Sequence, residues 1–288
     1  MKPAPFEYHA PETVADAVGV LADHGDDAKP LAGGQSLVPM LALRLARFEH
    51  LVDLNRVDEL TGVARDNGSL VVGAMTRQAT LERDDEVQVV PLLRRAAPLI
   101  GHFQIRNRGT VGGSIAHADP ASELPAVALA LDAELEVAAW AGTRVVPAGE
   151  FFAGTWTTVL EPTELLTAIR FPVWEGRCGF AVEEVARRHG DFALVGAACG
   201  VTLHDDGTIE RAAIGLFGVG STPLRAPAAE AAVAGRAGSA GELAEVGQLA
   251  VRDLEPPDDV HASARYRRAV GAHVVALALG AAVREAAG

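Results

Sequence analysis

The sequence predicts an α+β protein in which strands and short helices are followed by a C-terminal block of helices. Three observations support this fold class. The first third of the chain alternates helical and strand-like patterns, the middle contains a series of short apolar runs separated by turn residues, and the tail from about Pro227 is alanine-rich with helical spacing. Strands followed by a helical block, without strict βαβ alternation, favour α+β over a doubly wound parallel sheet.

Composition limits the class of protein and its partners. The 288 residues are 49% hydrophobic and 22% charged, which is typical of a globular chain with an ample core. The formal net charge of −13 argues against nucleic acid or an anionic membrane as the main partner. We predict boundaries near residue 57 and near Trp174, and therefore three parts: 1–57, 58–173 and 174–288.

In the first part, apolar residues recur at i, i+4 and i+7 over 14–21 and predict a helix that ends at Gly25. The apolar residues before Gly33 predict a short strand, and the run after Ser36 predicts the start of a helix. Further strands are predicted at "HLVDL" (50–54) and "SLVVGAMT" (69–76), the second preceded by the turn-rich "ARDNGS".

The rest of the chain follows the same logic. A helix is predicted over 89–103 with a break at Pro98. Asp206-Gly207 predicts a tight hairpin turn between two strands. Strands are predicted at "ELEVAAW", "RVVPAGEFF", "ELLTAIRFP", "FAVEEVA" and the apolar runs on either side of that hairpin turn.

Two glycine-rich loops are the strongest functional signal from the residues themselves. "AGGQS" (32–36) and "TVGGS" (110–114) each have an apolar lead-in, a Gly-Gly pair and a small polar residue. Consecutive glycines can turn several backbone N–H groups toward one point and so bind phosphate oxygens. Two such loops suggest a pyrophosphate held from both sides, although an ordinary turn is the alternative for each loop. Neither loop fits the Rossmann or the P-loop spacing.

Other polar motifs have simpler interpretations. His117 and Asp119 in "AHADP" favour loop hydrogen bonds and helix capping over a metal site or a general base. Asp119-Pro120 predicts the start of a helix. "HDDG" (204–207) favours a hairpin turn over a metal site. The arginines of "IRNRG" (105–109) could face a phosphate or a partner subunit, and the residues leave this open.

The two cysteines, Cys178 and Cys199, exclude a disulfide framework and an intrinsic iron–sulfur cluster, which usually needs four thiolates. The N-terminus lacks the apolar segment of a signal peptide, and the run "VVALALGAAV" is about half of the ~20 residues that a membrane span needs. We therefore expect a cytoplasmic protein without a membrane span.

Two long motifs resemble a known family. "PLAGGQSLVPMLALRLARFEHLVDLNRV" and "GHFQIRNRGTVGGSIAHADPASELPAVALAL" are similar to the FAD-binding medium subunit of the molybdenum hydroxylases, which include xanthine dehydrogenase, carbon monoxide dehydrogenase and quinoline oxidoreductase. The resemblance extends through "GAMTRQATLE" and "EEVARRHGDFALVGAA" to "SARYRRAVGAHVVALAL". It implies an FAD-binding fold of the vanillyl-alcohol-oxidase (PCMH) type in two α/β subdomains, followed by a C-terminal domain with a three-stranded antiparallel sheet packed by helices.

The resemblance also implies an FAD site with no catalytic or metal-binding residue of its own. Family members often have asparagine at the position of Ser114, and relatives can carry a lysine where this chain has Glu183 and Glu184. Ile100 falls near the position where xanthine dehydrogenase has an aromatic residue against the flavin ring. Leu166 and Arg187–Asp191 match segments that flank this ring. The implied cofactor-binding residues are Leu31, Ala32, Gly33, Gly34, Gln35, Ser36, Leu37, Ile100, Thr110, Val111, Gly112, Gly113, Ser114, Ala118, Glu123 and Leu166.

The function that the resemblance implies is electron transfer within a larger enzyme. The expected partners are a small [2Fe-2S] subunit and a large molybdenum-cofactor subunit, arranged as a dimer of heterotrimers, with NAD, oxygen or a quinone as the external acceptor. One alternative is a stand-alone FAD-dependent oxidase or reductase with its own substrate pocket. Another is a nucleotide-binding or assembly subunit without enzymatic activity.

Overall fold

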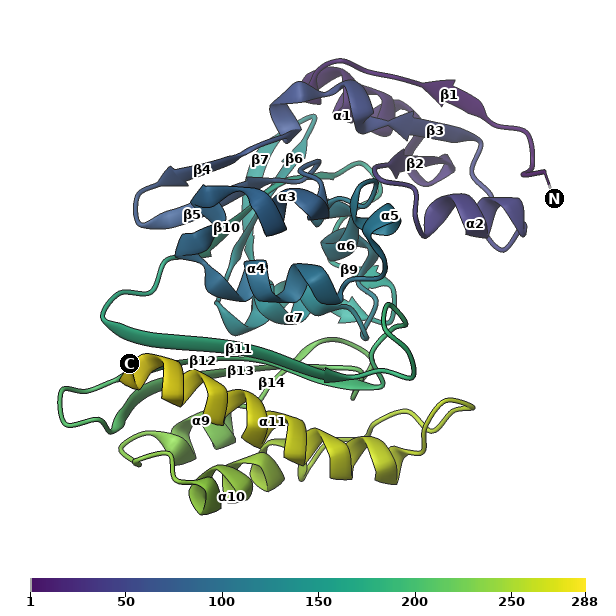
Figure 1. Cartoon of the computed structure of the whole chain (residues 1–288). Helices are drawn as coiled ribbons and strands as arrows, with labels where there is room; N and C mark the ends of the chain where they lie inside the picture. The colour runs from purple at the N-terminus through teal and green to yellow at the C-terminus, as the bar shows by residue number, and fades with distance from the viewer. Residues whose placement is uncertain (1) are drawn as a thin grey trace.

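The computed structural model describes residues 2–288, and in that part of the chain three larger sheets and one two-stranded ribbon organise the fold. Figure 1 shows them in chain order, with the N-terminal sheet at one end, the second sheet and its helices in the middle, and the C-terminal sheet with its helices at the other end. The predicted α+β class is confirmed.

The N-terminal sheet is parallel, in the order β1-β3-β2. Helix α1 (Val14–His24) packs on it through a core that includes Val18, Leu21 and Val52, as the spacing predicted. Thr13 caps the helix by accepting a hydrogen bond from the Asp16 amide at 3.0 Å. The strands are β1 (Glu7–His9), β2 (Ala28–Leu31) and β3 (His50–Asp53), and α2 (Leu37–Ala42) follows the first glycine loop.

The middle sheet is antiparallel, in the order β4-β5-β10-β6-β7, and its apolar face forms the largest core cluster. One predicted strand, 144–152, is only partly a strand, because the chain turns into a short helix that buries Phe151 completely. The strands are β4 (Val63–Asp66), β5 (Ser69–Gly73), β6 (Glu134–Ala139), β7 (Gly142–Pro147) and β10 (Leu165–Pro172), and the ribbon is β8 (Phe152–Gly154) with β9 (Thr157–Thr158).

Short helices and 3₁₀ turns cover this sheet. The predicted helix over 89–103 is split into α4, a 3₁₀ turn and α5, with Pro98 in the 3₁₀ turn. The helices are α3 (Gln78–Arg83), α4 (Pro91–Ala96), α5 (Phe103–Arg106), α6 (Val111–His117), α7 (Glu123–Ala130) and α8 (Ala148–Phe151), and the 3₁₀ turns are Gly25–Asp27, Leu54–Arg56, Asp58–Leu60, Asp85–Val89 and Ala97–Leu99.

The predicted helix start at Asp119-Pro120 is wrong. Helix α6 begins directly after Thr110 and ends at His117, and the next residue, Ala118, has a left-handed φ of 52°. Helix α7 begins only at Glu123. The Asp119 carboxylate instead accepts a hydrogen bond from the Ala121 amide at 2.9 Å, so it stabilises the turn between the two helices.

The C-terminal sheet has three antiparallel nine-residue strands, as the resemblance implied, plus a two-residue edge strand. The predicted hairpin turn is present, with Gly207 at φ 86°. The strands are β11 (Arg177–Val185), β12 (Val195–Leu203), β13 (Ile209–Phe217) and β14 (Leu224–Arg225), and the helices are α9 (Pro227–Val233), α10 (Ala240–Val251) and α11 (Ala264–Ala287).

Helix α11 is longer than its apolar run suggested. With 24 residues it is, among residues 2–288, the one helix long and apolar enough by composition to cross a membrane. Its Val275, Ala278 and Ala282 nevertheless lie in the C-terminal core. A Cβ on Gly179 would lie 1.9 Å from the Ala282 carbonyl oxygen, so glycine at this point of β11 lets the helix lie directly on the sheet. These contacts make α11 a core helix of this fold.

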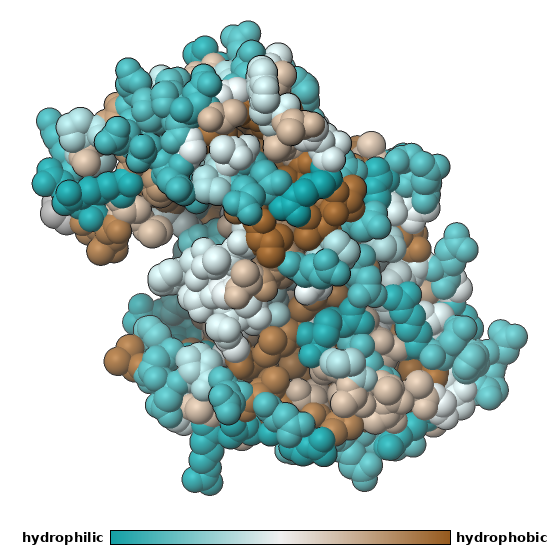
Figure 2. Space-filling model, turned by 180° about the vertical axis from the view of Figure 1, so that it is seen from behind, coloured by the Kyte–Doolittle hydropathy of each residue, from teal (hydrophilic) through white to brown (hydrophobic). Residues whose placement is uncertain are grey.

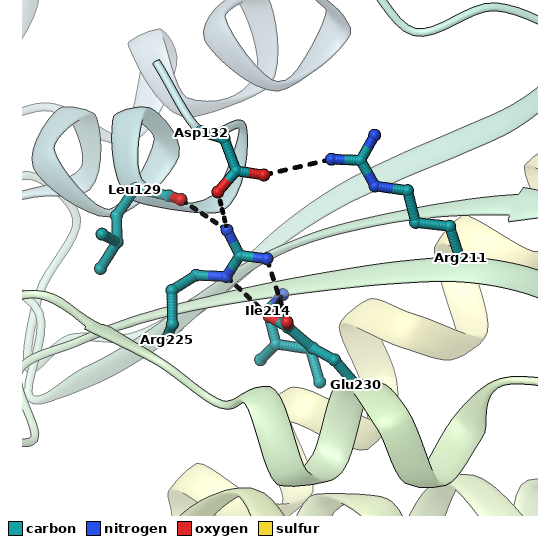
Figure 3. Close-up of polar contacts among 6 residues, drawn as sticks. All are labelled: Leu129, Asp132, Arg211, Ile214, Arg225 and Glu230. Carbon is teal, nitrogen blue, oxygen red and sulfur yellow. Dashed lines mark hydrogen bonds and ion pairs between the residues drawn. The ribbon is translucent and has the colours of Figure 1, made fainter. Parts of the chain in front are cut away.

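Ion pairs hold the C-terminal part to the middle part (Figure 3). Arg225 donates to the Leu129 carbonyl oxygen at the end of α7 (2.8 Å), to Asp132 (2.7 Å) and to Glu230 (2.7 and 3.0 Å). Arg211 donates to the other oxygen of Asp132 at 3.1 Å. One guanidinium therefore joins elements on both sides of the predicted boundary near Trp174.

Candidate functional site

The first glycine loop leaves a row of backbone donors without protein acceptors. It joins β2 to α2, and Gly34 turns the chain with a φ of 72°. Within residues 2–288, the amides of Gly33, Gly34, Gln35 and Ser36 donate to no backbone or side-chain acceptor. Four consecutive N–H groups without a protein acceptor are available to the anionic oxygens that the residue pattern predicts for this loop.

The second glycine loop differs, because its amides already have acceptors. Val111 donates to the Thr76 carbonyl (2.9 Å) and Gly112 to that of Ala74 (2.8 Å). The amides of Gly113 and Ser114 both donate to Thr110, to its hydroxyl at 3.0 Å and its carbonyl at 3.1 Å. The two loops therefore differ in how their backbone amides are used, and a pyrophosphate held from both sides stays a prediction. In this loop the amides hold α6 in place, and the Ser114 side chain is half-buried.

The two loops pack against each other through their glycines. A Cβ on Gly33 would lie 2.3 Å from the Arg108 carbonyl oxygen, and one on Gly113 would lie 3.4 Å from the Ala32 side chain. A Cβ on Gly112 would meet Ala74 at 2.4 Å. Glycine at these positions is required by contact between protein segments, in addition to any close approach of a ligand. The structure thus brings the residues of 32–36 and 110–114 together.

Two polar residues that the sequence did not single out connect these loops. Arg77 donates to the Arg108 carbonyl and, at 2.6 Å, to the Asn55 side chain. Asn55 in turn donates to the Ala32 carbonyl at 3.1 Å. Both line a small cavity beside the loops, together with Thr76. The only sequence signal for them is a polar residue directly after each predicted strand (50–54 and 69–76), in "DLNRV" and "GAMTRQ".

Two carboxyl groups with raised pKa values, Glu123 and Glu184, lie close enough for their charges to interact. Glu123, at the start of α7, is 5% exposed, and burial, assisted by the charges of Glu184 and Asp119, raises its pKa to about 8. Burial also raises the pKa of Glu184 to about 7, and one of its oxygens has no hydrogen-bond partner among the described residues. Near neutral pH these two groups therefore hold much less than two negative charges.

The remaining residues that were predicted to contact the cofactor are mostly apolar and buried or half-buried. Ile100 and Leu166 are 9% and 4% exposed and belong to the same core cluster as Val111. Ala118 is fully buried, and its carbonyl accepts a hydrogen bond from the Trp156 amide at 3.2 Å. Leu31 and Leu37 are half-buried at the two ends of the first loop.

The loop Arg187–Asp191 lies against the segment that leads into the second glycine loop. A Cβ on Gly190 would lie 2.6 Å from the His102 ring, whose centroid is 5.9 Å from that of His189. Phe103 and Phe192 beside this contact are both more than 60% exposed. Figure 2, seen from behind, shows a recess between the N-terminal lobe and the lower part of the molecule, with apolar surface on both sides of it.

The structure assigns simple roles to several residues whose sequence interpretation was open. Arg106 is buried, pairs with Glu82 at 2.6 Å and donates to the Ile100 and Gly101 carbonyls, so it braces its own turn. His117 stacks on Trp156, whose indole donates to Asp119 at 3.0 Å. Burial lowers the pKa of His117.

Comparison with known proteins agrees with this geometry. Residues 4–174 match the family described as the FAD binding domain in molybdopterin dehydrogenase, and residues 180–282 match the CO dehydrogenase flavoprotein C-terminal domain. The chain is 40% identical over 284 residues to the carbon monoxide dehydrogenase medium chain of Hydrogenophaga pseudoflava, covering 98% of each. The chain belongs to the FAD-binding medium subunits of the molybdenum hydroxylases.

Other known proteins are similar to the chain over nearly their whole length. The 6-hydroxypseudooxynicotine dehydrogenase complex subunit alpha of Paenarthrobacter nicotinovorans is 42% identical over 271 residues, covering 94% of this chain and 92% of the relative. Solved carbon monoxide dehydrogenase from Hydrogenophaga pseudoflava superimposes with a TM-score of 0.96 at 42% identity, covering 99% of each chain. Quinoline 2-oxidoreductase from Pseudomonas putida 86 gives 0.94 at 36% identity, again over 99% of each. As a medium subunit, the chain is an FAD-binding component of an oxidoreductase.

Proposed function

We propose that this chain is the electron-transfer subunit of a heterotrimeric molybdenum hydroxylase, in which it receives electrons from a small [2Fe-2S] subunit and passes them to an external acceptor. The partner set follows from its relatives, which include a carbon monoxide dehydrogenase medium chain and a subunit of a dehydrogenase complex. A dimer of such heterotrimers in the cytoplasm is the expected assembly.

The observation that supports this role most directly is the row of four free amides in the first loop, set against the second loop. These amides would hold the FAD pyrophosphate, with the Gln35, Ser36 and Ser114 side chains adding hydrogen bonds. The other predicted cofactor-binding residues would surround the rest of the FAD. When bound, FAD supplies the ability to accept and release electrons singly or in pairs.

The chain's own residues would control the electrostatics of the site. Proton uptake by Glu123 and Glu184 keeps negative charge away from a cofactor that gains electrons. The Arg187–Asp191 loop, held against His102, would set how closely an acceptor such as NAD, oxygen or a quinone approaches. No residue of this chain acts as a general base toward the substrate in this account, since substrate oxidation belongs to the molybdenum subunit.

Purification of the native protein from its own cells tests the proposal. We expect an absorption spectrum with flavin bands, release of FAD at about one per chain, and co-isolation of a cysteine-rich small chain and a large molybdenum-containing chain. A monodisperse flavin-containing monomer that oxidises its own substrate would support the stand-alone oxidase or reductase. A colourless chain that also fails to take up added FAD would overturn both.

A further inference from the structure

Three histidines from separate elements meet on one side of the N-terminal sheet, away from the glycine loops. His9 ends β1, His24 ends α1 and His50 begins β3. In the parallel register Glu7 lies opposite His50, so Glu7, His9 and His50 share one face of the sheet. Val52 lies on the same face and packs with Leu21 of α1, which shows that this is the face that α1 covers. The last turn of α1 brings His24 to it.

The ring nitrogens of the three histidines lie close together. His9 Nε2 is 3.1 Å from His50 Nδ1, and the His50 nitrogen is 3.2 Å from a Glu7 carboxylate oxygen. The His24 and His50 rings stack with centroids 3.6 Å apart. One nitrogen from each histidine can be chosen so that all three lie within 4.8 Å of one another. For comparison, ligands around tetrahedral zinc with Zn–N of 2.0–2.1 Å are about 3.3 Å apart.

The residue types that meet here are those that bind a transition metal. All three histidines are half-buried, so the point where they meet is partly shielded from water. Neutral imidazole, with its free nitrogen lone pair, is the form that binds zinc, nickel and copper. The neighbouring carboxylate of Glu7 is 74% exposed and can reach the same point as a fourth ligand or as the acceptor that orients a ring.

We propose that His9, His24 and His50 form a binding site for a divalent transition metal of the zinc class, with Glu7 beside it. The ion would tie the short edge strand β1 to α1 and β3. Tyr8, between Glu7 and His9, donates a hydrogen bond to Asp53. Asp53 also accepts a hydrogen bond from Asn55, and Asn55 donates to the Ala32 carbonyl of the first glycine loop. The site is structural and takes no part in electron transfer.

Titration of the purified, untagged, flavin-loaded protein with zinc chloride after chelator treatment tests this proposal. We expect one high-affinity zinc per chain by calorimetry and elemental analysis, no comparable binding of magnesium, and a higher melting temperature with zinc. His24→Gln should weaken zinc binding at least tenfold and abolish the rise in melting temperature. His261→Gln, which changes an exposed histidine outside the cluster, should leave both unchanged.

Flavin content checks that each variant is folded. If His24→Gln loses flavin or does not fold, His9→Gln on the edge strand replaces it and should show the same loss of zinc binding. Wild-type zinc affinity in the folded cluster variant would overturn the site. So would equal zinc binding and equal melting-temperature changes in the wild type and both variants, because the zinc would then be held elsewhere.

Discussion

The Cα atom of Gly33 faces the carbonyl oxygen of Arg108 so closely that a Cβ at residue 33 would lie 2.3 Å from that oxygen and 2.7 Å from Gly109. The same carbonyl accepts a hydrogen bond from Arg77, so it is not free to swing away. The two glycine loops therefore form one unit, and the free amides of the first loop have a fixed position relative to the second.

Gly33→Ala should separate the loops and reduce FAD binding. Overpacking of this kind typically costs about 1–3 kcal/mol, because backbone atoms must shift. We expect a lower flavin-to-protein ratio and a lower melting temperature. Gly241→Ala is the matched control, since a Cβ there meets nothing within 4 Å and Gly241 lies in the first turn of α10, where alanine is well tolerated. Full flavin content in Gly33→Ala would contradict the role of this contact.

Glu123 should make stability depend on pH. Its pKa is raised from 4.5 to about 8 in the folded chain, so between these values the folded state keeps a proton that the unfolded state has lost. The free energy of unfolding must therefore decrease as pH rises through that window, by up to about 1.4 kcal/mol per pH unit. Urea unfolding of flavin-free protein from pH 5 to 8 measures this slope.

Glu123→Gln should flatten the decrease, because an amide binds no proton. Glu184→Gln should flatten it between pH 4.5 and about 7, the range over which that carboxyl titrates. Glu245→Gln, an exposed side chain, serves as the control. An unchanged slope in both buried variants would show that these carboxyl groups do not bind protons in the folded chain as described.

Arg225→Met should weaken the attachment of the C-terminal domain. The substitution removes the partner of Glu230, whose side chain is 13% exposed, and of the Leu129 carbonyl. Loss of one member of a largely buried ion pair costs roughly 2–4 kcal/mol, since the other stays desolvated. In contrast, Arg252→Met breaks a pair whose side chains are 65% and 82% exposed and should change the free energy of unfolding by less than about 0.5 kcal/mol. Equal stability of the two variants in urea unfolding would refute the importance of the Arg225 contacts.

Gly190→Ala tests whether the Arg187–Asp191 loop controls access of the electron acceptor. Gly190 has φ 85° and contacts His102, whereas Gly207 has φ 86° with nothing within 4 Å, so the two alanine variants share backbone strain and differ in the contact. We expect normal flavin content in both. The rate at which an external acceptor reoxidises the reduced holoenzyme should change in Gly190→Ala alone. Identical rates, measured by stopped-flow absorbance, would remove the loop from this role.

Local signals predicted much of the fold because they act over a few residues. The spacing of Val14, Val18 and Leu21 specifies a helix, and Asp206-Gly207 specifies a hairpin, whatever surrounds them. The start of α7 was misplaced because Asp119 and Pro120 have the same residue preferences in a turn as at a helix start. The contacts of Asp119 with Ala121 and Trp156 decide between the two.

The sequence by itself determined the α+β class and, through its long motifs, the family, while pyrophosphate binding by the two glycine loops stays a prediction from it. Only the tertiary structure decided that the first loop keeps its amides free while the second uses them internally, because acceptors such as the Ala74 and Thr76 carbonyls come from the segment that follows β5. It also decided that Gly33 faces Arg108 and that His9, His24 and His50 converge. Such contacts join residues far apart in the chain, and no local spacing or propensity records them.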